Sequence, residues 1–116
     1  VLVQVGAGLV HEVVLVARDG QAPVCLVGLA RADGTPVYGV SSEMDGQAAQ
    51  ALGDGRFRFV LRFDALPLLP GEYRLRSHAL DGQGLRLFDT VERPLVVTGR
   101  AREFGLVRLP HRWGDG

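Results

Sequence analysis

The stretch Arg56-Phe57-Arg58-Phe59-Val60-Leu61-Arg62-Phe63 decides the fold class. Its side chains fall into two alternating series, with Phe57, Phe59, Leu61 and Phe63 in one and Arg56, Arg58, Val60 and Arg62 in the other. Successive side chains of a β-strand point to opposite faces of its sheet. This period of two therefore predicts a strand with one aromatic, buried face.

Apolar runs of this kind recur along the chain between turn residues. Residues 72–80 alternate in the same way. Residues 24–30 are apolar on both faces, which predicts a central strand that is covered on both sides or one with a partner molecule over it. Further strands are expected at residues 1–5, 9–18, 36–40, 85–88, 94–98 and 104–109. Residues 47–52 are expected to form either one helical turn or a loop. Asp-Gly pairs, which suit tight turns, separate many of the runs and predict an all-β sandwich or barrel.

The segment Leu66-Pro67-Leu68-Leu69-Pro70-Gly71-Glu72-Tyr73 narrows this choice. A Pro-Gly turn comes just before a Tyr at the start of a predicted strand. This arrangement resembles the tyrosine corner of immunoglobulin-like sandwiches, in which the Tyr hydroxyl returns to the backbone a few residues upstream. We therefore expect one domain over residues 1–116, an immunoglobulin-like antiparallel β-sandwich, in which Tyr73 is structural.

Composition excludes several classes of protein. The 13 basic residues, all Arg, balance 13 Asp and Glu, so the formal net charge is zero. A general nucleic-acid binder or a polybasic membrane patch needs a positive surplus. No stretch has the apolar length of a membrane span, so we expect no direct membrane insertion. The single Cys25 excludes an intrachain disulfide framework, and we expect it to be buried and unreactive.

The sequence carries no motif of an enzyme. It has no Walker-type phosphate loop, no short metal-ligand spacing among its 3 His, and no nucleophile elbow around its Ser residues. We therefore expect no catalytic residue, no metal and no cofactor. A small hydrolase or lyase remains an alternative if the fold brings His78 or His111 against Asp64 or Asp89.

Polar residues on two predicted strands give the first indication of a binding surface. Arg74, Arg76 and His78 project from one strand, and Arg56, Arg58 and Arg62 project from another. If the two strands share a sheet, their guanidinium donors form a face that suits hydroxyl-rich or anionic ligands. The other interpretation is a solvated sheet face whose Arg stems cover apolar surface.

Several segments together resemble one known family. The first segment has the strand, the Asp-Gly turn and the Val-Tyr-Gly return that are typical of this family; it is Val27-Gly28-Leu29-Ala30-Arg31-Ala32-Asp33-Gly34-Thr35-Pro36-Val37-Tyr38-Gly39. Three later segments also fit the family: Leu69-Pro70-Gly71-Glu72-Tyr73, Leu87-Phe88-Asp89 followed by Leu95-Val96-Val97, and Glu103-Phe104-Gly105-Leu106-Val107 with Trp113 after it. The family is the carbohydrate-binding C-terminal domain of the ATP-binding subunit of O-antigen polysaccharide ABC exporters (Wzt-type proteins). The family often has Asn-Thr after the Tyr-Gly step, where this chain has Val40-Ser41-Ser42.

This resemblance implies a function and partners. The family binds the non-reducing end of a lipid-linked O-antigen polysaccharide, and this recognition licenses export. The implied partners are that polysaccharide, the ATP-binding domain of the same full-length chain, and a second copy in a homodimer with terminal strand exchange. The implied location is cytoplasmic, at the inner face of the inner membrane. Because the sequence opens on Val1 without an initiator Met, we interpret it as a C-terminal fragment of a longer chain.

The physics of glycan binding selects the candidate residues. Polar side chains hold sugar hydroxyls, and aromatic rings stack on sugar C–H faces. The predicted glycan-binding residues are Arg74, Arg76, His78, Tyr38, Arg86 and Trp113. For Trp113 the competing interpretation is a packing anchor of the C-terminal segment or a dimer contact. The alternative function is a structural or dimerisation sandwich without glycan specificity.

Overall fold

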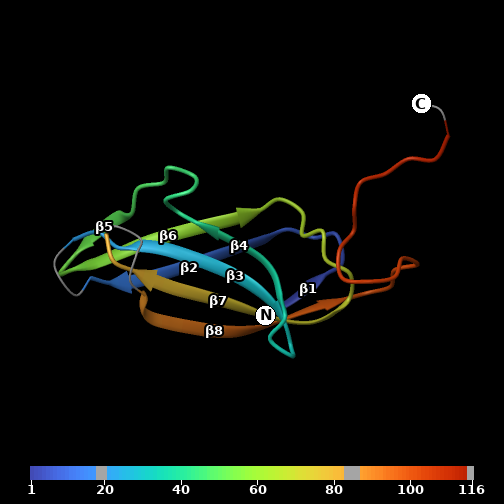
Figure 1. Ribbon diagram of the computed structural model, residues 1–116, viewed down its shortest axis with the longest axis horizontal. Coiled ribbons are helices and arrows are strands. Elements are labelled where there is room, and N and C mark those ends of the chain that lie inside the picture. Colours follow the sequence, from blue (N-terminus) through green and yellow to red (C-terminus); the bar gives the residue numbers. More distant parts are fainter. Residues whose placement is uncertain (18–20, 83–86, 115–116) are drawn as a thin grey trace.

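Two β-sheets form the body of the protein. The computed structural model describes residues 1–17, 21–82 and 87–114, and these residues form strands and no helix (Figure 1). The strands are β1 (Leu2–Gln4), β2 (Leu9–Val16), β3 (Val24–Arg31), β4 (Pro36–Ser41), β5 (Gln50–Gly53), β6 (Arg56–Phe63), β7 (Gly71–Leu80) and β8 (Leu87–Thr98). The prediction of an all-β, immunoglobulin-like sandwich is confirmed. Within the described ranges, no helix is long and apolar enough to cross a membrane.

The sheets differ in size. The larger sheet has five strands in the order β1-β8-β7-β3-β4, with β1 parallel to β8 and the other neighbours antiparallel. The smaller sheet is antiparallel, with three strands in the order β2-β6-β5. A buried hydrogen bond of 2.6 Å between His11 of β2 and Ser77 of β7 joins the inner faces of the two sheets. It places β2 over β7.

The alternation in the sequence determines which side chains enter the core. On β7, Tyr73, Leu75, Ser77 and Ala79 are buried, while the intervening residues face away from the core. On β6, whose observed bounds equal the predicted ones, Phe59, Leu61 and Phe63 pack on the core from the other sheet. Apolar burial of this kind is the main favourable term in folding. Leu75 and Leu95, which are 2% and 0% exposed, lie at its centre.

The tyrosine corner forms as predicted. The Tyr73 hydroxyl donates a hydrogen bond to the carbonyl oxygen of Leu69 at 2.6 Å, four residues upstream. The carbonyl oxygen of Leu106 lies 3.2 Å from the same hydroxyl. Because the ring is only 3% exposed, this bond satisfies a polar group that burial would otherwise leave without a partner.

The prediction of a strand at residues 104–109 is wrong. The segment instead forms one isolated antiparallel bridge between Leu68 and Val107, with backbone bonds from Leu69 to Leu106 and from Arg108 to Pro67. Beyond this contact the chain leaves the sandwich, as Figure 1 shows by the red trace. Leu66 donates its amide to Ala7 and β7 begins at Gly71, so a short stretch between them is left to pair with the C-terminal residues.

Two other predictions need correction. The strand β8 continues through residues 89–93, where the sequence predicts a break. It tolerates Pro94 because the carbonyl oxygen of Pro94 accepts from the Val1 amino group and so points toward the β1 side. The missing N–H of Pro94 points the same way, away from β7, so the ladder with β7 loses no bond. Residues 50–53 form the exposed edge strand β5, where a helical turn or a loop is expected.

We predict that Tyr73→Phe lowers the free energy of unfolding by about 1 kcal/mol, because it removes one net hydrogen bond and leaves the Leu69 carbonyl with one partner fewer. Denaturant titration measures the change, and the slope with denaturant should stay constant. The matched control is Tyr38→Phe, at a ring that is 55% exposed. Equal effects of the two substitutions would show that the corner bond contributes nothing to stability.

Candidate functional site

The polar face predicted on β7 exists. Arg74, Arg76 and His78 lie on the outer face of the five-stranded sheet, and all three bond to β8. Glu92 of β8 lies opposite Arg76 and forms ion pairs with both arginines. Its Oε1 is 2.6 Å from Nη1 of Arg74, and its Oε2 is 2.9 Å from Nε of Arg76. Nδ1 of His78 lies 2.8 Å from the Thr90 hydroxyl. We call these three residues with Glu92 the β7 face.

The carboxylate of Glu92 is shared by two guanidinium groups. Glu72 lies on the same outer face of β7, two residues from Arg74, so the formal charges of this region balance. The hydrogen bonds from Arg74 and Arg76 hold the pKa of Glu92 below its usual value. Burial, followed by the charge of Arg76, lowers the pKa of His78. Each guanidinium spends one donor nitrogen on Glu92 and keeps others, so the face can still donate to an anionic group.

The second arginine row lies elsewhere. The row consists of Arg56, Arg58 and Arg62 on β6, which belongs to the three-stranded sheet. Because β7 belongs to the other sheet, the two rows do not form the joint face that a shared sheet would give. A period of two predicts which residues share a face of a strand, but not which sheet the strand joins. The Arg58 guanidinium is already engaged, by Glu12 through two nitrogens and by Gln50 at 3.0 Å.

The remaining predicted residues are dispersed. Tyr38 is 55% exposed on the edge strand β4 and pairs with Leu29, whereas Arg76 pairs with Gly28, so the two are not in one cross-strand row. Trp113 is 93% exposed, so in the single chain it does not anchor the C-terminal segment against the body. Arg86 lies outside the described residues.

The structure provides no support for the cluster that the hydrolase alternative needs. The Nδ1 atom of His78 meets the hydroxyl of Thr90, and that of His111 lies 2.8 Å from the carbonyl oxygen of Leu109. Among the described residues, no group of three or more His, Cys, Asp or Glu side chains could hold a metal ion. The buried His11–Ser77 pair has Arg93 as its charged neighbour, and Ser77 does not line the cavity described next.

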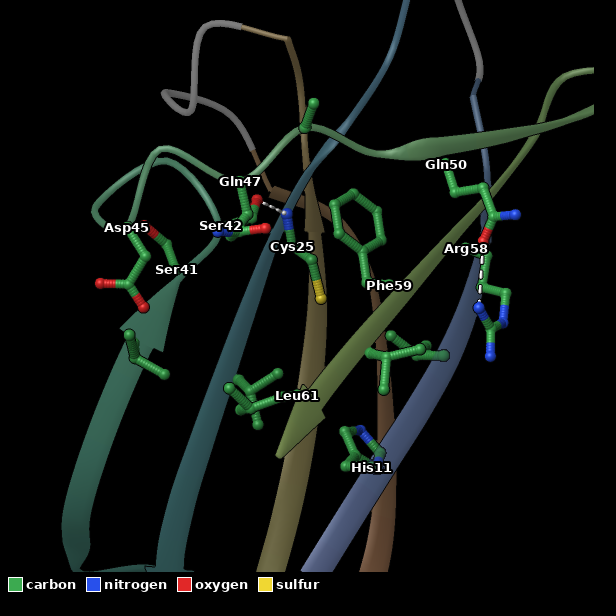
Figure 2. A pocket seen from close by; sticks show the side chains of 15 residues that line it. His11, Cys25, Ser41, Ser42, Asp45, Gln47, Gln50, Arg58, Phe59 and Leu61 are labelled. Carbon is green, nitrogen blue, oxygen red and sulfur yellow. Dashed lines mark hydrogen bonds between the residues drawn. The ribbon is translucent and has the colours of Figure 1, made fainter. Parts of the chain in front are cut away.

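A cavity that the sequence does not predict lies between the sheets. It has a volume of about 300 Å³ and lies between β4 of one sheet and β5 and β6 of the other, beside the loop 42–49 (Figure 2). It is lined by His11, Val13, Cys25, Val27, Val40, Ser41, Ser42, Asp45, Gln47, Ala48, Gln50, Arg58, Phe59, Val60 and Leu61. We call it the inter-sheet cavity. Its volume is at the lower end of the range for small-molecule sites.

Hydrogen bonds hold the loop beside this cavity in place. Ser42 and Cys25 bond reciprocally, since the Ser42 hydroxyl accepts from the Cys25 amide at 3.1 Å and the Ser42 amide donates to the Cys25 carbonyl at 2.8 Å. The Ser41 hydroxyl accepts from the Met44 amide at 3.1 Å, and the Gln47 amide donates to the Ser42 carbonyl at 2.8 Å. The loop is therefore tied to β3 and to itself.

The lining combines an apolar floor with a polar wall. In Figure 2, Cys25, Phe59 and Leu61 lie in the middle, with Ser41, Ser42, Asp45 and Gln47 on one side. Burial raises the pKa of Cys25 to about 11, so its thiol stays neutral at physiological pH. The side chains of Asp45 and Gln47 are exposed, and in the described part of the chain neither has a bonding partner. These two groups are thus available to a ligand.

One signal in the sequence could have indicated the polar wall. Residues 41–50 (SSEMDGQAAQ) contain one large apolar side chain, Met44, which is a long polar run for a connection between two strands. Long connections of this kind are often functional. The floor could not be predicted, because it needs residues from β2, β3 and β6 brought together by the packing of the two sheets.

Comparison with known proteins supports the fold. No protein-family model matches the sequence, and no curated protein matches it. Among solved structures, the chain is similar to the crystal structure of the C-terminal domain of Wzt, with a TM-score of 0.65 and 17% identity. The match covers 97% of this chain and 72% of that chain. The resemblance drawn from the sequence is therefore confirmed at the level of the fold.

The His11–Ser77 pair leads to a prediction about pH. Burial, followed by the charge of Arg93, lowers the pKa of His11 below 6.5 in the folded state. As the pH falls below about 6.5, the unfolded chain binds a proton that the folded chain rejects. The free energy of unfolding should therefore decrease as the pH is lowered, until the pH falls below the pKa that His11 has in the folded state.

Denaturant titration between pH 7.5 and pH 5 measures this loss. In His11→Gln, whose amide nitrogen can replace the bond to Ser77, the loss should be smaller. The comparison variant is His78→Gln, at a partly exposed histidine whose pKa is also lowered, and it should remove a smaller part of the loss. A His11→Gln profile parallel to that of the unsubstituted chain would contradict the assignment.

Proposed function

We propose that this domain is a non-catalytic carbohydrate-binding module. In this proposal it recognises the non-reducing end of a lipid-linked O-antigen polysaccharide for export by an ABC transporter. The fold shared with the Wzt C-terminal domain supports the class of protein. The observation that carries the proposal is the inter-sheet cavity, which is lined by the free polar groups of Asp45 and Gln47 on one side and by the aromatic ring of Phe59 in the middle.

This combination of groups suits a single sugar ring. A carboxylate such as that of Asp45 accepts hydrogen bonds from sugar hydroxyls, and an amide such as that of Gln47 both donates and accepts. An aromatic ring offers an apolar surface to the C–H face of the sugar. Since Asp45 is the free charge at this site and is negative, the cavity favours a neutral sugar over an anionic one.

The predicted residue Tyr38 can extend this site. It precedes Val40, which lines the cavity, by two positions on β4, and residues two apart share one face of a strand. A sugar that projects from the cavity along β4 would meet the exposed Tyr38 ring. We therefore include Tyr38 with the cavity in the proposed glycan site.

The β7 face is the second candidate surface. Arg74 and Arg76 keep guanidinium donors that Glu92 does not use, and charge-assisted donors of this kind suit an anionic substituent on the glycan better than a neutral ring. Arg86 and Trp113 remain further proposed contacts. The two surfaces thus differ in the sign of the ligand charge they favour.

The proposed partners follow from the same family. They are the ATP-binding domain of a longer chain, at the cytoplasmic face of the inner membrane, and a second copy of this domain. The C-terminal segment supports the second copy, because Phe104, Leu109 and Trp113 are 98%, 69% and 93% exposed. Large apolar side chains that are this exposed suit burial in a partner.

Calorimetric titration with O-antigen polysaccharide fragments that keep their native non-reducing end tests the proposal. We expect binding, and we expect Gln47→Ala and Asp45→Asn each to weaken it about tenfold, because each removes one hydrogen bond, in part to a charged group. The matched control is Glu43→Gln, on the same loop but outside the cavity lining, which should leave the affinity unchanged. Tight dimerisation without binding of any such fragment would favour the structural alternative.

Salt separates the two candidate surfaces. If the cavity carries binding, affinity should change little between low and high ionic strength, and the triple substitution of Arg74, Arg76 and His78 by Ala should have little effect. If the β7 face carries it, affinity should fall with salt and with the triple substitution. Titrations at two salt concentrations distinguish these outcomes, and we expect the first for neutral glycans.

A further inference from the structure

His11 is a buried polar side chain that the proposed glycan contacts do not include. It is 6% exposed, it comes from β2, and it lines the inter-sheet cavity. In Figure 2 it lies at one end of the cavity, while Asp45 and Gln47 lie at the other. Buried polar groups are normally hydrogen-bonded, so both nitrogens of this ring need a partner.

One of the two ring nitrogens is bonded within the protein. Nε2 of His11 lies 2.6 Å from the hydroxyl oxygen of Ser77 on β7. Ser77 is 3% exposed, and its hydroxyl has no other acceptor in the described part of the chain. A buried hydroxyl proton without an acceptor is costly, so the Ser77 hydroxyl donates and Nε2 accepts.

The acceptor role of Nε2 fixes the position of the ring proton. Burial, followed by the charge of Arg93, lowers the pKa of His11, so the ring is neutral at physiological pH. A neutral imidazole carries one proton, and with Nε2 as the acceptor this proton is on Nδ1. His11 therefore presents one N–H donor, at Nδ1.

This donor has no partner within the described ranges of the chain. Every side-chain nitrogen or oxygen that is sealed from solvent there has a hydrogen-bond partner. Nδ1 of His11 has none among these residues, so it is open to solvent space. The inter-sheet cavity is the space that this ring lines. The cavity thus has a donor at the end opposite the Asp45 carboxylate.

We propose that His11 is a specificity-determining contact of the glycan site, an inference that rests on the proposed function of the inter-sheet cavity. The Nδ1–H group donates a hydrogen bond to one oxygen of a neutral sugar ring, while Asp45 and Gln47 bond hydroxyls at the other end. A sugar that lacks this oxygen leaves a buried donor unpaired, so the cavity discriminates against it.

Ser77 has a different role in this proposal. It does not line the cavity and does not touch the sugar. Its hydroxyl holds the ring in the tautomer that presents the donor, so Ser77 is a positioning residue. The two residues therefore need separate tests, one of the tautomer and one of the sugar contact.

Nitrogen NMR of the imidazole rings tests the tautomer in the whole chain without ligand. At pH 7.5 we expect the proton of His11 on Nδ1. In Ser77→Ala, which removes the donor to Nε2, we expect both tautomers to be populated. The ring of His111, whose Nδ1 lies 2.8 Å from the carbonyl oxygen of Leu109, is the internal reference and should not change between the two chains.

The probes for the sugar contact are the methyl glycosides of glucose, galactose and mannose, each with its monodeoxy analogues. NMR titration measures their dissociation constants. We expect at least one glycoside to bind and to shift the Nδ1 signal of His11. One of its monodeoxy analogues should bind about tenfold more weakly, because it leaves the Nδ1 proton without an acceptor.

The double variant His11→Leu with Ser77→Ala tests whether this discrimination comes from His11. It removes both partners of the buried bond and so leaves no orphan polar group. The deficit of that one analogue should disappear in it. Ser77→Ala alone should weaken binding of the glycoside about twofold, if about half of the rings then lack the donor. The matched control is His111→Gln, outside the cavity lining, which should change no affinity.

The outcomes separate this inference from the proposed function. A ring proton on Nε2 in the free chain would overturn the inference, and so would a discrimination that survives in the double variant. If O-antigen fragments bind through Asp45 and Gln47 while the His11 ring signals stay unmoved, the proposed function stands and the inference is wrong. Binding of none of the glycosides also overturns the inference, and the titration with O-antigen fragments then tests the proposed function alone.

Discussion

The hydrogen bond from the Tyr73 hydroxyl to the Leu69 carbonyl is the constraint on which the rest of the structure depends. It fixes the end of the segment that crosses from β6 in one sheet to β7 in the other, while Leu66, Leu68 and Leu69 are buried beneath it. The same segment receives the C-terminal residues through Leu106 and Arg108. With β7 held there, its inner face meets β2 at His11, and its outer face presents the arginines to β8. The buried Tyr73 hydroxyl thus joins the crossing segment, β7 and the C-terminal residues at one point.

Local patterns predicted the parts of the fold that local patterns determine. The period of two in β6 and β7 gave the correct inner and outer residues, and the Pro-Gly-Glu-Tyr sequence gave the correct role for Tyr73. The pattern could not assign the two arginine rows to sheets, because that depends on non-local pairing. The pattern also predicted a break in β8 where the strand in fact continues. A Pro costs a ladder hydrogen bond only if its missing N–H would face a paired strand, and at Pro94 that direction depends on non-local pairing.

The candidate site was predicted less well, for a related reason. Arg74, Arg76 and His78 do share a face, but Glu92 and Thr90 on the paired strand already occupy part of their bonding capacity. The inter-sheet cavity draws its floor from three strands that are distant in sequence, so no window of the sequence contains it. The zero net charge likewise hides an uneven distribution, with a free carboxylate at the cavity and two arginines that share Glu92 on the β7 face.

The position of Cys25 has a consequence for experiments on this domain. It is the single thiol of the chain, it lies 3% exposed in the cavity floor, and its backbone is clamped to Ser42 on both sides. Because the thiolate is the nucleophile that attacks an alkylating reagent, a neutral and buried thiol reacts only when its surroundings open. The rate of Cys25 alkylation therefore reports how often the loop separates from β3. A ligand that fills the cavity would lower this rate, and the measurement would need no engineered label.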